Sequence, residues 1–456
     1  MWKRIGAALL ALGLCLPLSG CAVTGFDAQA LMSPPKANED QQSIHKLLQG
    51  SKSDITFIYP KTGEYRSAII THDFTGSGKL DALGFYSAED GSVQVQFLTK
   101  SDGKWKTADT FQNSATQVDR VCFGDLDGDG VDDVLIGWGS TSGSTGRTAN
   151  VCAYLYGDGN LTEYTLGTYG ELTVTDFDGD GKDELFTADK YIPAEEENAE
   201  ESPALARVFS FEDGQIRELY TAPVDHTISN YISIAFGKLS AGTSGVVLDG
   251  AKADGSMTTQ IFYVRDGALK NEPSGVNTDK YVNVFSRPST AVFTSRDLNG
   301  DGVIEIPVVS PLPGIAADVA LDSTSYFVEW GRYDFGGGSR PAVRTLINSG
   351  ENYWFELPAP LWGKISASNT PQTRTVTYTE VVGEGTEESP KLLASPLFSI
   401  RVFTRSAWDS RGAMSGYEKI IEQSDLVYGI QVFTADEEYL SAIQQIKSHF
   451  RLISDQ

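Results

Sequence analysis

Short apolar segments recur along most of the chain, and many of them alternate apolar and polar residues. Segments of about four to eight residues bounded by Gly, Asp and Asn predict β-strands rather than helices. Two consecutive groups show the same order of four such segments, separated by turn residues. They are residues 66–74, 81–86, 92–99 and 105–111, followed by 118–123, 133–138, 150–156 and 161–166. Each group therefore predicts one four-stranded unit.

The unit recurs about every fifty to sixty residues, with starts at positions 73, 125, 176, 238 and 297. An apolar residue follows each start, and a further apolar pair comes about ten residues later. Several short strands per repeat of this length favour a β-propeller over a helical solenoid. We expect a mainly β fold, with about five four-stranded blades over residues 54–350. Residues 54–59 or the segment after Tyr326 could build a sixth blade, and a seventh is not excluded.

Three units carry the pattern D-x-[DN]-G-D-G-x-x-[DE] between their first two strands. It places oxygen-bearing side chains at loop positions 1, 3, 5 and 9, and the carbonyl at position 7 can add another oxygen. Calcium prefers six to eight oxygen ligands of these kinds. The candidate ligands are Asp125, Asp127, Asp129, Val131 and Asp133; Asp176, Asp178, Asp180, Lys182 and Glu184; and Asp297, Asn299, Asp301, Val303 and Glu305.

Two other interpretations of these loops remain open to comparison with the sequence: an EF-hand and a metal-free turn. An EF-hand needs a glutamate at position 12 and flanking helices, whereas position 12 is Ile136, Thr187 or Val308 and β-prone residues follow. Plain Asx and glycine turns without a metal are the second alternative. The unit at 73–81 keeps the glycines but has Thr75 and Ser77, and the unit at 238–246 keeps only an outline. Metal binding is therefore not assigned to these two.

These loops and their spacing resemble the FG-GAP or VCBS type of repeat, found in the β-propeller of integrin α subunits and in bacterial surface proteins. The resemblance covers roughly residues 60–350. It implies a loop that joins the first two strands of each blade and binds a structural Ca²⁺.

The N-terminus resembles the signal of a bacterial lipoprotein. Lys3 and Arg4 precede an apolar stretch that is too short to span a bilayer, and Leu18-Ser19-Gly20-Cys21 follows. The resemblance implies removal of residues 1–20, lipidation of Cys21 and an extracytoplasmic protein anchored to the bacterial membrane. A plain secretory signal cut elsewhere is the alternative. Residues 21–53 then form a tether with one short helix, in which Ile44, Leu47 and Leu48 form an apolar stripe.

Residues 351–456 depart from the repeat and predict a small α+β domain. Strands are expected at 374–382, 397–404 and 426–434, followed by a helix capped by Thr434 with Leu440, Ile443, Ile446 and Phe450 on its buried side. The pattern of this region resembles the PsbP-like domains of exported lipoproteins.

Two cysteines, Cys122 and Cys152, remain beyond the signal, on the first and third predicted strands of one blade. Strands two places apart are about 9.6 Å apart, and a disulfide needs Cα atoms within about 7 Å. We therefore expect two free, buried thiols.

The net charge and the absence of catalytic motifs limit the classes of function to consider. The net charge of −25 disfavours nucleic acid and anionic lipid surfaces as partners. The sequence contains no G-x-S-x-G, H-E-x-x-H or C-x-x-C motif. We expect a surface-anchored, calcium-stabilised module that binds a protein or glycan ligand. A cell-envelope hydrolase or lyase acting on glycan, with its site on the propeller rim, is the alternative.

Overall fold

The computed structural model describes most of the chain beyond the N-terminal segment. The described residues are 39–50, 55–139, 149–193, 203–240, 242–272, 286–315, 323–334, 338–382, 392–412 and 415–453. The predicted signal, Cys21 and most of the predicted tether lie outside these residues. None of the described helices is long and apolar enough to cross a membrane.

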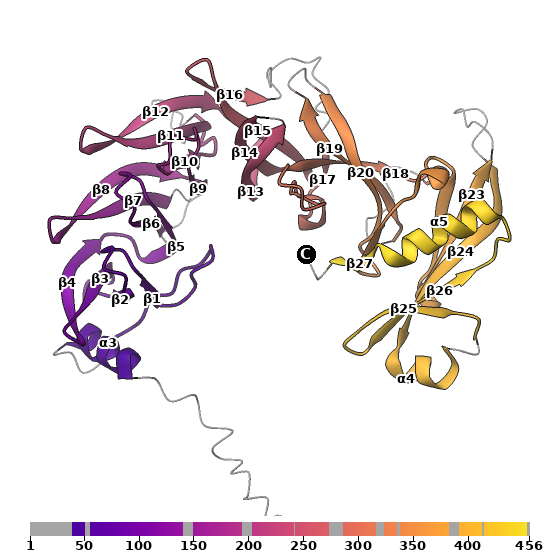
Figure 1. The fold of residues 1–456 in the computed structure, drawn as a ribbon, viewed down its shortest axis with the longest axis horizontal. Coiled ribbons are helices and arrows are strands. Elements are labelled where there is room, and N and C mark those ends of the chain that lie inside the picture. The colour runs from indigo at the N-terminus through magenta and orange to yellow at the C-terminus, as the bar shows by residue number, and fades with distance from the viewer. Residues whose placement is uncertain are drawn as a thin grey trace, which may run out of the picture.

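The fold is mainly β and consists of consecutive antiparallel sheets of the β-propeller type, as predicted (Figure 1). The first three sheets have four strands each, in chain order across the sheet. Their strands are β1 Ile69–His72, β2 Asp81–Ser87, β3 Val93–Ser101 and β4 Lys104–Asn113; β5 Gln117–Gly124, β6 Asp133–Gly139, β7 Ala149–Gly157 and β8 Asn160–Tyr169; and β9 Glu171–Thr175, β10 Glu184–Ala188, β11 Leu205–Glu212 and β12 Gln215–Pro223.

The fourth and fifth sheets each gain one strand. The fourth consists of β13 Ile228–Ser240, β14 Thr243–Lys252, β15 Ser256–Arg265 and β16 Ala268–Glu272, with β17 Arg287–Pro288 paired to β15. The fifth has the order β18 Glu305–Pro311, β19 Tyr326–Asp334, β20 Gly338–Asn348, β21 Tyr353–Glu356 and β27 Phe450–Leu452. The segment after Tyr326 thus belongs to the fifth sheet, and residues 56–58 extend the first sheet by pairing with β2. Neither of them builds a sixth blade.

A sixth sheet and one helix form the C-terminal α+β region. The elements are β22 Ile365–Thr370, β23 Thr375–Val382, β24 Leu392–Thr404, β26 Leu426–Val432 and β25 Glu418–Gln423 in sheet order, and helix α5 Glu437–Ser448. Short helical turns lie at α4 Arg405–Ala407, η1 Ala291–Phe293, η2 Ala359–Leu361, η3 Pro371–Thr373 and η4 Trp408–Gly412.

The boundary predicted at residue 350 needs correction. It falls between β20 and β21, which pair with each other in the fifth sheet. β27, after α5, then pairs with β21 and ties the end of the chain to the same sheet. Residues 351–456 are therefore joined to the fifth sheet by hydrogen-bonded strands rather than separated from it.

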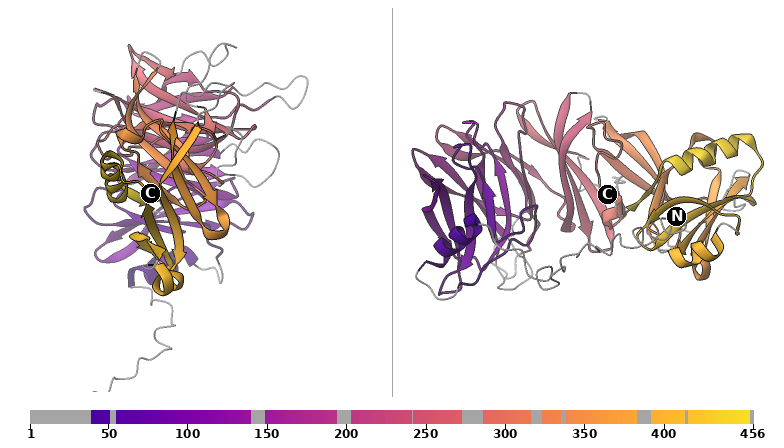
Figure 2. Two further views of the ribbon diagram at one scale, coloured as in Figure 1. Left: turned by 90° about the vertical axis from the view of Figure 1, so that its right-hand side faces the viewer. Right: turned by 60° about the horizontal axis from the view of Figure 1, so that its bottom comes forward.

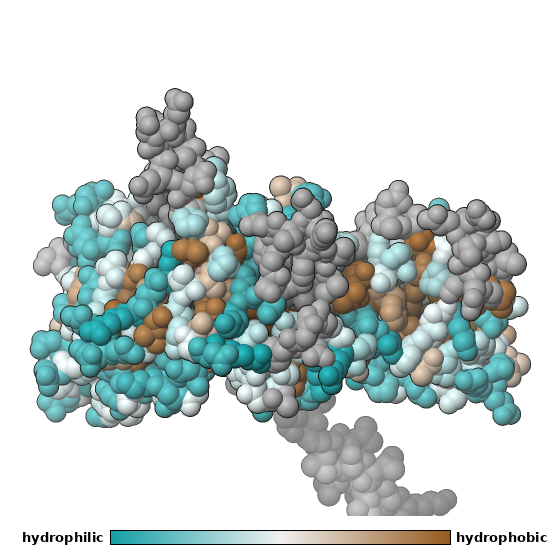
Figure 3. Space-filling view, turned by 90° about the horizontal axis from the view of Figure 1, so that it is seen from above, coloured by the Kyte–Doolittle hydropathy of each residue, from teal (hydrophilic) through white to brown (hydrophobic). Residues whose placement is uncertain are grey.

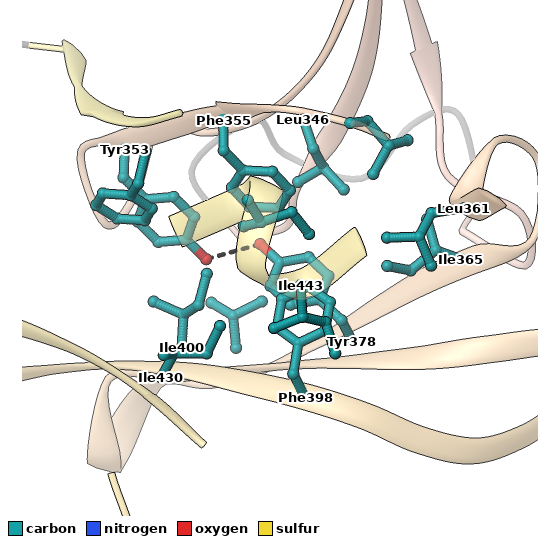
Figure 4. Packing of buried hydrophobic residues seen from close by; sticks show 14 of the residues in the cluster. Leu346, Tyr353, Phe355, Leu361, Ile365, Tyr378, Phe398, Ile400, Ile430 and Ile443 are labelled. Atoms are coloured by element: carbon teal, nitrogen blue, oxygen red, sulfur yellow. Dashed lines mark hydrogen bonds between the residues drawn. The ribbon is translucent and has the colours of Figure 1, made fainter. Parts of the chain in front are cut away.

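One hydrophobic core fills the junction between the fifth sheet and the C-terminal region. Leu346 and Phe355 from the fifth sheet pack with Phe398 of β24 and Ile443 of α5 (Figure 4). Within this core the hydroxyls of Tyr353 and Tyr378 lie 2.7 Å apart. The hydrogen bond links β21 to β23, so buried polar groups are satisfied across the junction.

Helix α3 (Glu39–Gln49) covers the opposite end of the molecule. Side chains alternate along β2, so Leu83 and Phe85 face the second sheet while Ala82 and Tyr86 face the helix. Ile44 and Leu48 of α3 are buried against that outer face. A Cβ on Gly84 would lie 2.5 Å from Leu48, so the glycine leaves room for the helix. The predicted helix and its apolar stripe are confirmed.

The first and last sheets do not meet, and the sheets form an open arc (Figures 1 and 2). α3 covers the free face of the first sheet, and the C-terminal region covers that of the fifth. Repeat arrays need covered ends, because an end repeat would otherwise expose the face that its neighbours bury. Between the ends, hydrophilic residues dominate the outer surface seen in Figure 3, and hydrophobic ones form smaller separate groups.

Removing the contact between α3 and the first sheet is expected to destabilise this end of the arc. Leu48→Ala should lower the free energy of unfolding by about 2–4 kcal/mol, because a buried leucine is lost and a cavity remains. Chemical denaturation measures this change. Lys46→Ala on the exposed side of the same helix is the control and should have little effect; equal effects would mean that α3 does not dock as described.

The C-terminal helix corrects two details of the prediction. Asp436, not Thr434, caps α5, because its carboxylate accepts hydrogen bonds from the backbone N–H groups of Glu438 and Tyr439. Leu440 is 38% exposed, whereas Ile443 and Ile446 are buried. Phe450 is buried but lies in β27, after the helix has ended. The apolar stripe is therefore shorter than the sequence pattern indicates.

The two cysteines lie on the first and third strands of the second sheet, as predicted. Cys122 on β5 and Cys152 on β7 flank β6, and both are free. Burial raises the pKa of the Cys122 thiol to about 11, which makes it a poor nucleophile at neutral pH. Thiol titration of the denatured mature protein should find both unoxidised, and a Cys122–Cys152 disulfide found by mass spectrometry would contradict the strand order.

Candidate cation-binding loops

The two strands that flank each loop begin to pair at equivalent positions in every sheet that contains the motif. The position 9 residue pairs with the residue before position 1, as in Gly124↔Asp133 and Thr175↔Glu184. The equivalent pairs in the first and fifth sheets are His72↔Asp81 and Arg296↔Glu305. The position 9 carboxylate is buried in all four sheets, so the strand pairing holds it beneath the loop.

The loop at 125–133 has its carboxylates directed by its own backbone. Asp125 accepts hydrogen bonds from the N–H groups of Gly128 and Gly130, at 2.8 and 2.9 Å. Asp133 accepts one from Leu126, the apolar position 2 residue, which is buried. Gly128 and Gly130 have positive φ, which glycine adopts without strain. The apolar frame thus anchors the loop, and the glycines allow its turn.

Carboxylate oxygens of Asp125, Asp127 and Asp129 lie within 4.8 Å of one another. Two oxygens bound to one Ca²⁺ at about 2.4 Å can be up to about 4.8 Å apart, so this group fits the cation. Burial and the nearby Asp127 carboxylate raise the pKa of Asp133 to about 8. A bound cation would remove the cost of ionising it.

The loop at 176–184 repeats this arrangement. Carboxylate oxygens of Asp176, Asp178 and Asp180 also lie within 4.8 Å of one another. Glu184 accepts from the N–H of Phe177 at 2.9 Å, and burial raises its pKa to about 7. Among the described residues, no Lys or Arg forms an ion pair with the predicted carboxylates of these two loops. Both loops therefore bring their predicted side chains together in a form that suits calcium.

The loop at 297–305 has the same backbone pattern but different neighbours. Asp297 accepts from the N–H groups of Gly300 and Gly302, both at 2.7 Å. The amide of Asn299 donates to Glu305 at 3.2 Å. Arg332 of β19 donates to Asp301 and lies 3.5 Å from Glu305. The backbone therefore holds Asp297 as it holds Asp125, but a guanidinium contacts Asp301 and Glu305.

The two units that depart from the motif, at 73–81 and 238–246, differ from each other in structure. In the loop at 73–81 the hydroxyl of Thr75 donates to Asp81 at 2.7 Å, so the residues at positions 3 and 9 bond to each other. In the fourth sheet the ladder between β13 and β14 continues to Ser240↔Thr243. A hairpin this tight leaves no nine-residue loop.

Position 8, which the sequence reasoning missed, joins the loops into a row. Asp183 donates its N–H to the carbonyl of Asp125 at 2.8 Å, and its carboxylate accepts from the N–H of Asp125 at 3.0 Å. Asp132 lies 2.8 Å from Nε2 of His72, and Ile304 donates its N–H to the carbonyl of Lys238. Each of these residues contacts the start of the preceding unit. Its side-chain type varies, so the sequence pattern gave no signal.

Position 7 adds to the same row. A Cβ on Gly76 would lie 2.4 Å from Val131, and one on Gly128 would lie 2.9 Å from Lys182. The position 7 side chain therefore rests on the position 4 glycine of the preceding loop. Ordering one loop thus also orders its contacts with the neighbouring sheet.

A recess of about 590 Å³ lies where α3 meets the loop at 73–81. Asp40 of α3, Leu80 of the loop and Trp105 of β4 line it. Lys100 contacts the carboxylate of Asp40 at 2.7 Å and lies 5.5 Å from the centre of the Trp105 ring. The recess combines an aromatic ring with polar groups, but its main charges neutralise each other.

Comparisons with known proteins give one sequence match and a set of structural matches. Residues 54–136 match the sequence model of the FG-GAP-like repeat. No curated protein matches the chain. One similar solved structure is described as the crystal structure of BBS1N in complex with ARL6DN, soaked with lead. The identity is 11%, the TM-score is 0.28, and the match covers 84% of this chain and 95% of that chain.

Proposed function

We propose that the protein is a calcium-stabilised scaffold whose sheets hold a row of rim loops in place for binding a protein or glycan ligand. The observation that carries the calcium part is the convergence of Asp125, Asp127 and Asp129, repeated by the carboxylates of the loop at 176–184. The FG-GAP-like repeat over residues 54–136 supports the propeller-type binding module.

Calcium would act here on the packing between sheets. The loop at 125–133 contacts the preceding loop through Val131 and the following loop through Asp125. A cation that fixes this loop therefore stabilises two sheet–sheet junctions. The residues that would hold it are the carboxylates at positions 1, 3, 5 and 9, and the cation supplies charge neutralisation rather than chemistry.

The proposal includes lipidation of Cys21 and attachment to the bacterial membrane from the extracytoplasmic side. Extracellular calcium-binding modules work at about 10⁻⁴–10⁻³ M, which suits solvent-facing loops such as these. Metabolic labelling with a fatty acid should mark the wild-type protein and not Cys21→Ala.

Calorimetric titration of the purified mature chain tests the calcium part. We expect saturable binding of Ca²⁺ and weaker binding of Mg²⁺, which demands a smaller and more rigid octahedral site. Heat signals no larger than dilution, together with identical thermal melts in calcium and in chelator, would reject the proposal.

A further inference from the structure

An arginine stands opposite the position 9 carboxylate in the fifth sheet. The pairing of β18 with β19 places Arg332 directly across from Glu305. The side chain of Glu305 is fully buried, while that of Arg332 is 41% exposed. The guanidinium donates to Asp301 at loop position 5 and lies 3.5 Å from Glu305 at position 9. One cationic group thus reaches two carboxylates that would both face a metal.

The other sheets carry no cation at the equivalent place. Continuing the β10–β11 register by one residue places Ser210 opposite Glu184, and its hydroxyl donates to that carboxylate at 3.3 Å. The same step places Leu155 opposite Asp133 and Thr99 opposite Asp81. Arginine at this register position is therefore specific to the fifth sheet among the four sheets that contain the loop.

We propose that the guanidinium of Arg332 replaces the cation in the loop at 297–305, which is a metal-free copy, while the loops at 125–133 and 176–184 bind Ca²⁺. The inference rests on the proposed calcium binding by those two loops. A guanidinium supplies permanent positive charge and several N–H donors in a rigid plane. It therefore donates a hydrogen bond to Asp301 and forms an ion pair with Glu305 without a metal, and a Ca²⁺ ion would have to displace it.

If Arg332 replaces the cation, the two ends of the arc should respond differently to the removal of calcium. The second and third sheets carry the calcium loops, whereas the fifth sheet has an internal substitute and shares its core with the C-terminal region. Removing calcium should loosen the N-terminal half and leave the C-terminal half folded. The same fold would then have one calcium-dependent end and one calcium-independent end.

Calcium stoichiometry tests the inference. After dialysis against CaCl₂, elemental analysis of the purified mature chain should find two ions per wild-type chain. Arg332→Ser, which copies the residue at the same register position in the third sheet, should bind three, and Arg332→Gln should also bind three. Ser210→Arg should bind one. Arg405→Gln removes an exposed arginine of α4, outside the sheets that carry the loops, and should stay at two.

The outcomes separate this inference from the proposed function. Three ions in the wild type would overturn the inference and leave calcium binding in place. Two ions in both Arg332 variants, with circular dichroism showing a folded protein, would also overturn it. No calcium in any variant would reject the proposed function and the inference with it.

Discussion

Asp127→Ala should remove most of the calcium-dependent stabilisation that comes from the loop at 125–133. A ligand that binds only the folded state stabilises it by about 2.7 kcal/mol per site at a hundred times its Kd. The difference between melting temperatures in calcium and in chelator, several degrees for the wild type, should therefore fall to about half. Differential scanning calorimetry in both buffers measures it.

Ser77→Ala is the matched control for this experiment. Ser77 occupies position 5 in the loop at 73–81, where the motif lacks carboxylates at positions 3 and 5. The change should leave the calcium-dependent difference as in the wild type. If Asp127→Ala and Ser77→Ala behave alike, the carboxylates of the second loop do not hold the cation.

A chain ending at residue 350 should fail to fold into a soluble product. The cut removes β21 and β27 from the fifth sheet and exposes buried Leu312 and Leu346. The sequence alone suggests the opposite, that residues 54–350 form a separate unit. Size-exclusion chromatography of this fragment and of the full mature chain compares the two expectations.

A second fragment tests the contribution of β27 alone. Ending the chain at residue 448 keeps the sixth sheet and α5 but deletes β27. It should remain soluble with lowered stability, because one short edge strand and buried Phe450 and Leu452 are lost. A soluble, monomeric chain ending at residue 350, with α3 retained and a cooperative melt, would show that the shared core is dispensable.

Local pattern was sufficient to predict the repeated parts of the fold. Strand alternation and turn residues predict the bounds of β1 to β8 to within a few residues. In each of two loops, the nine-residue motif brings the carboxylates of that loop together. These features depend on neighbours in sequence. The buried position 2 residues, such as Leu126 and Phe177, confirm that the apolar frame serves packing.

Long-range contacts were beyond the sequence pattern. Nothing local to Arg332 shows that it reaches Asp301, because the contact depends on the register of β18 with β19. Pairing of β27 with β21 likewise moves Phe450 out of the helix and removes the boundary at 350. The same limit applies to α3, whose stripe is visible in the sequence while the face it covers is not.

The calcium content of the purified mature chain tests the central claim most directly. Elemental analysis after equilibration with calcium and removal of the free ion should find bound calcium, two ions per chain. A chain without bound calcium, whose thermal melt is the same in chelator, would contradict the account.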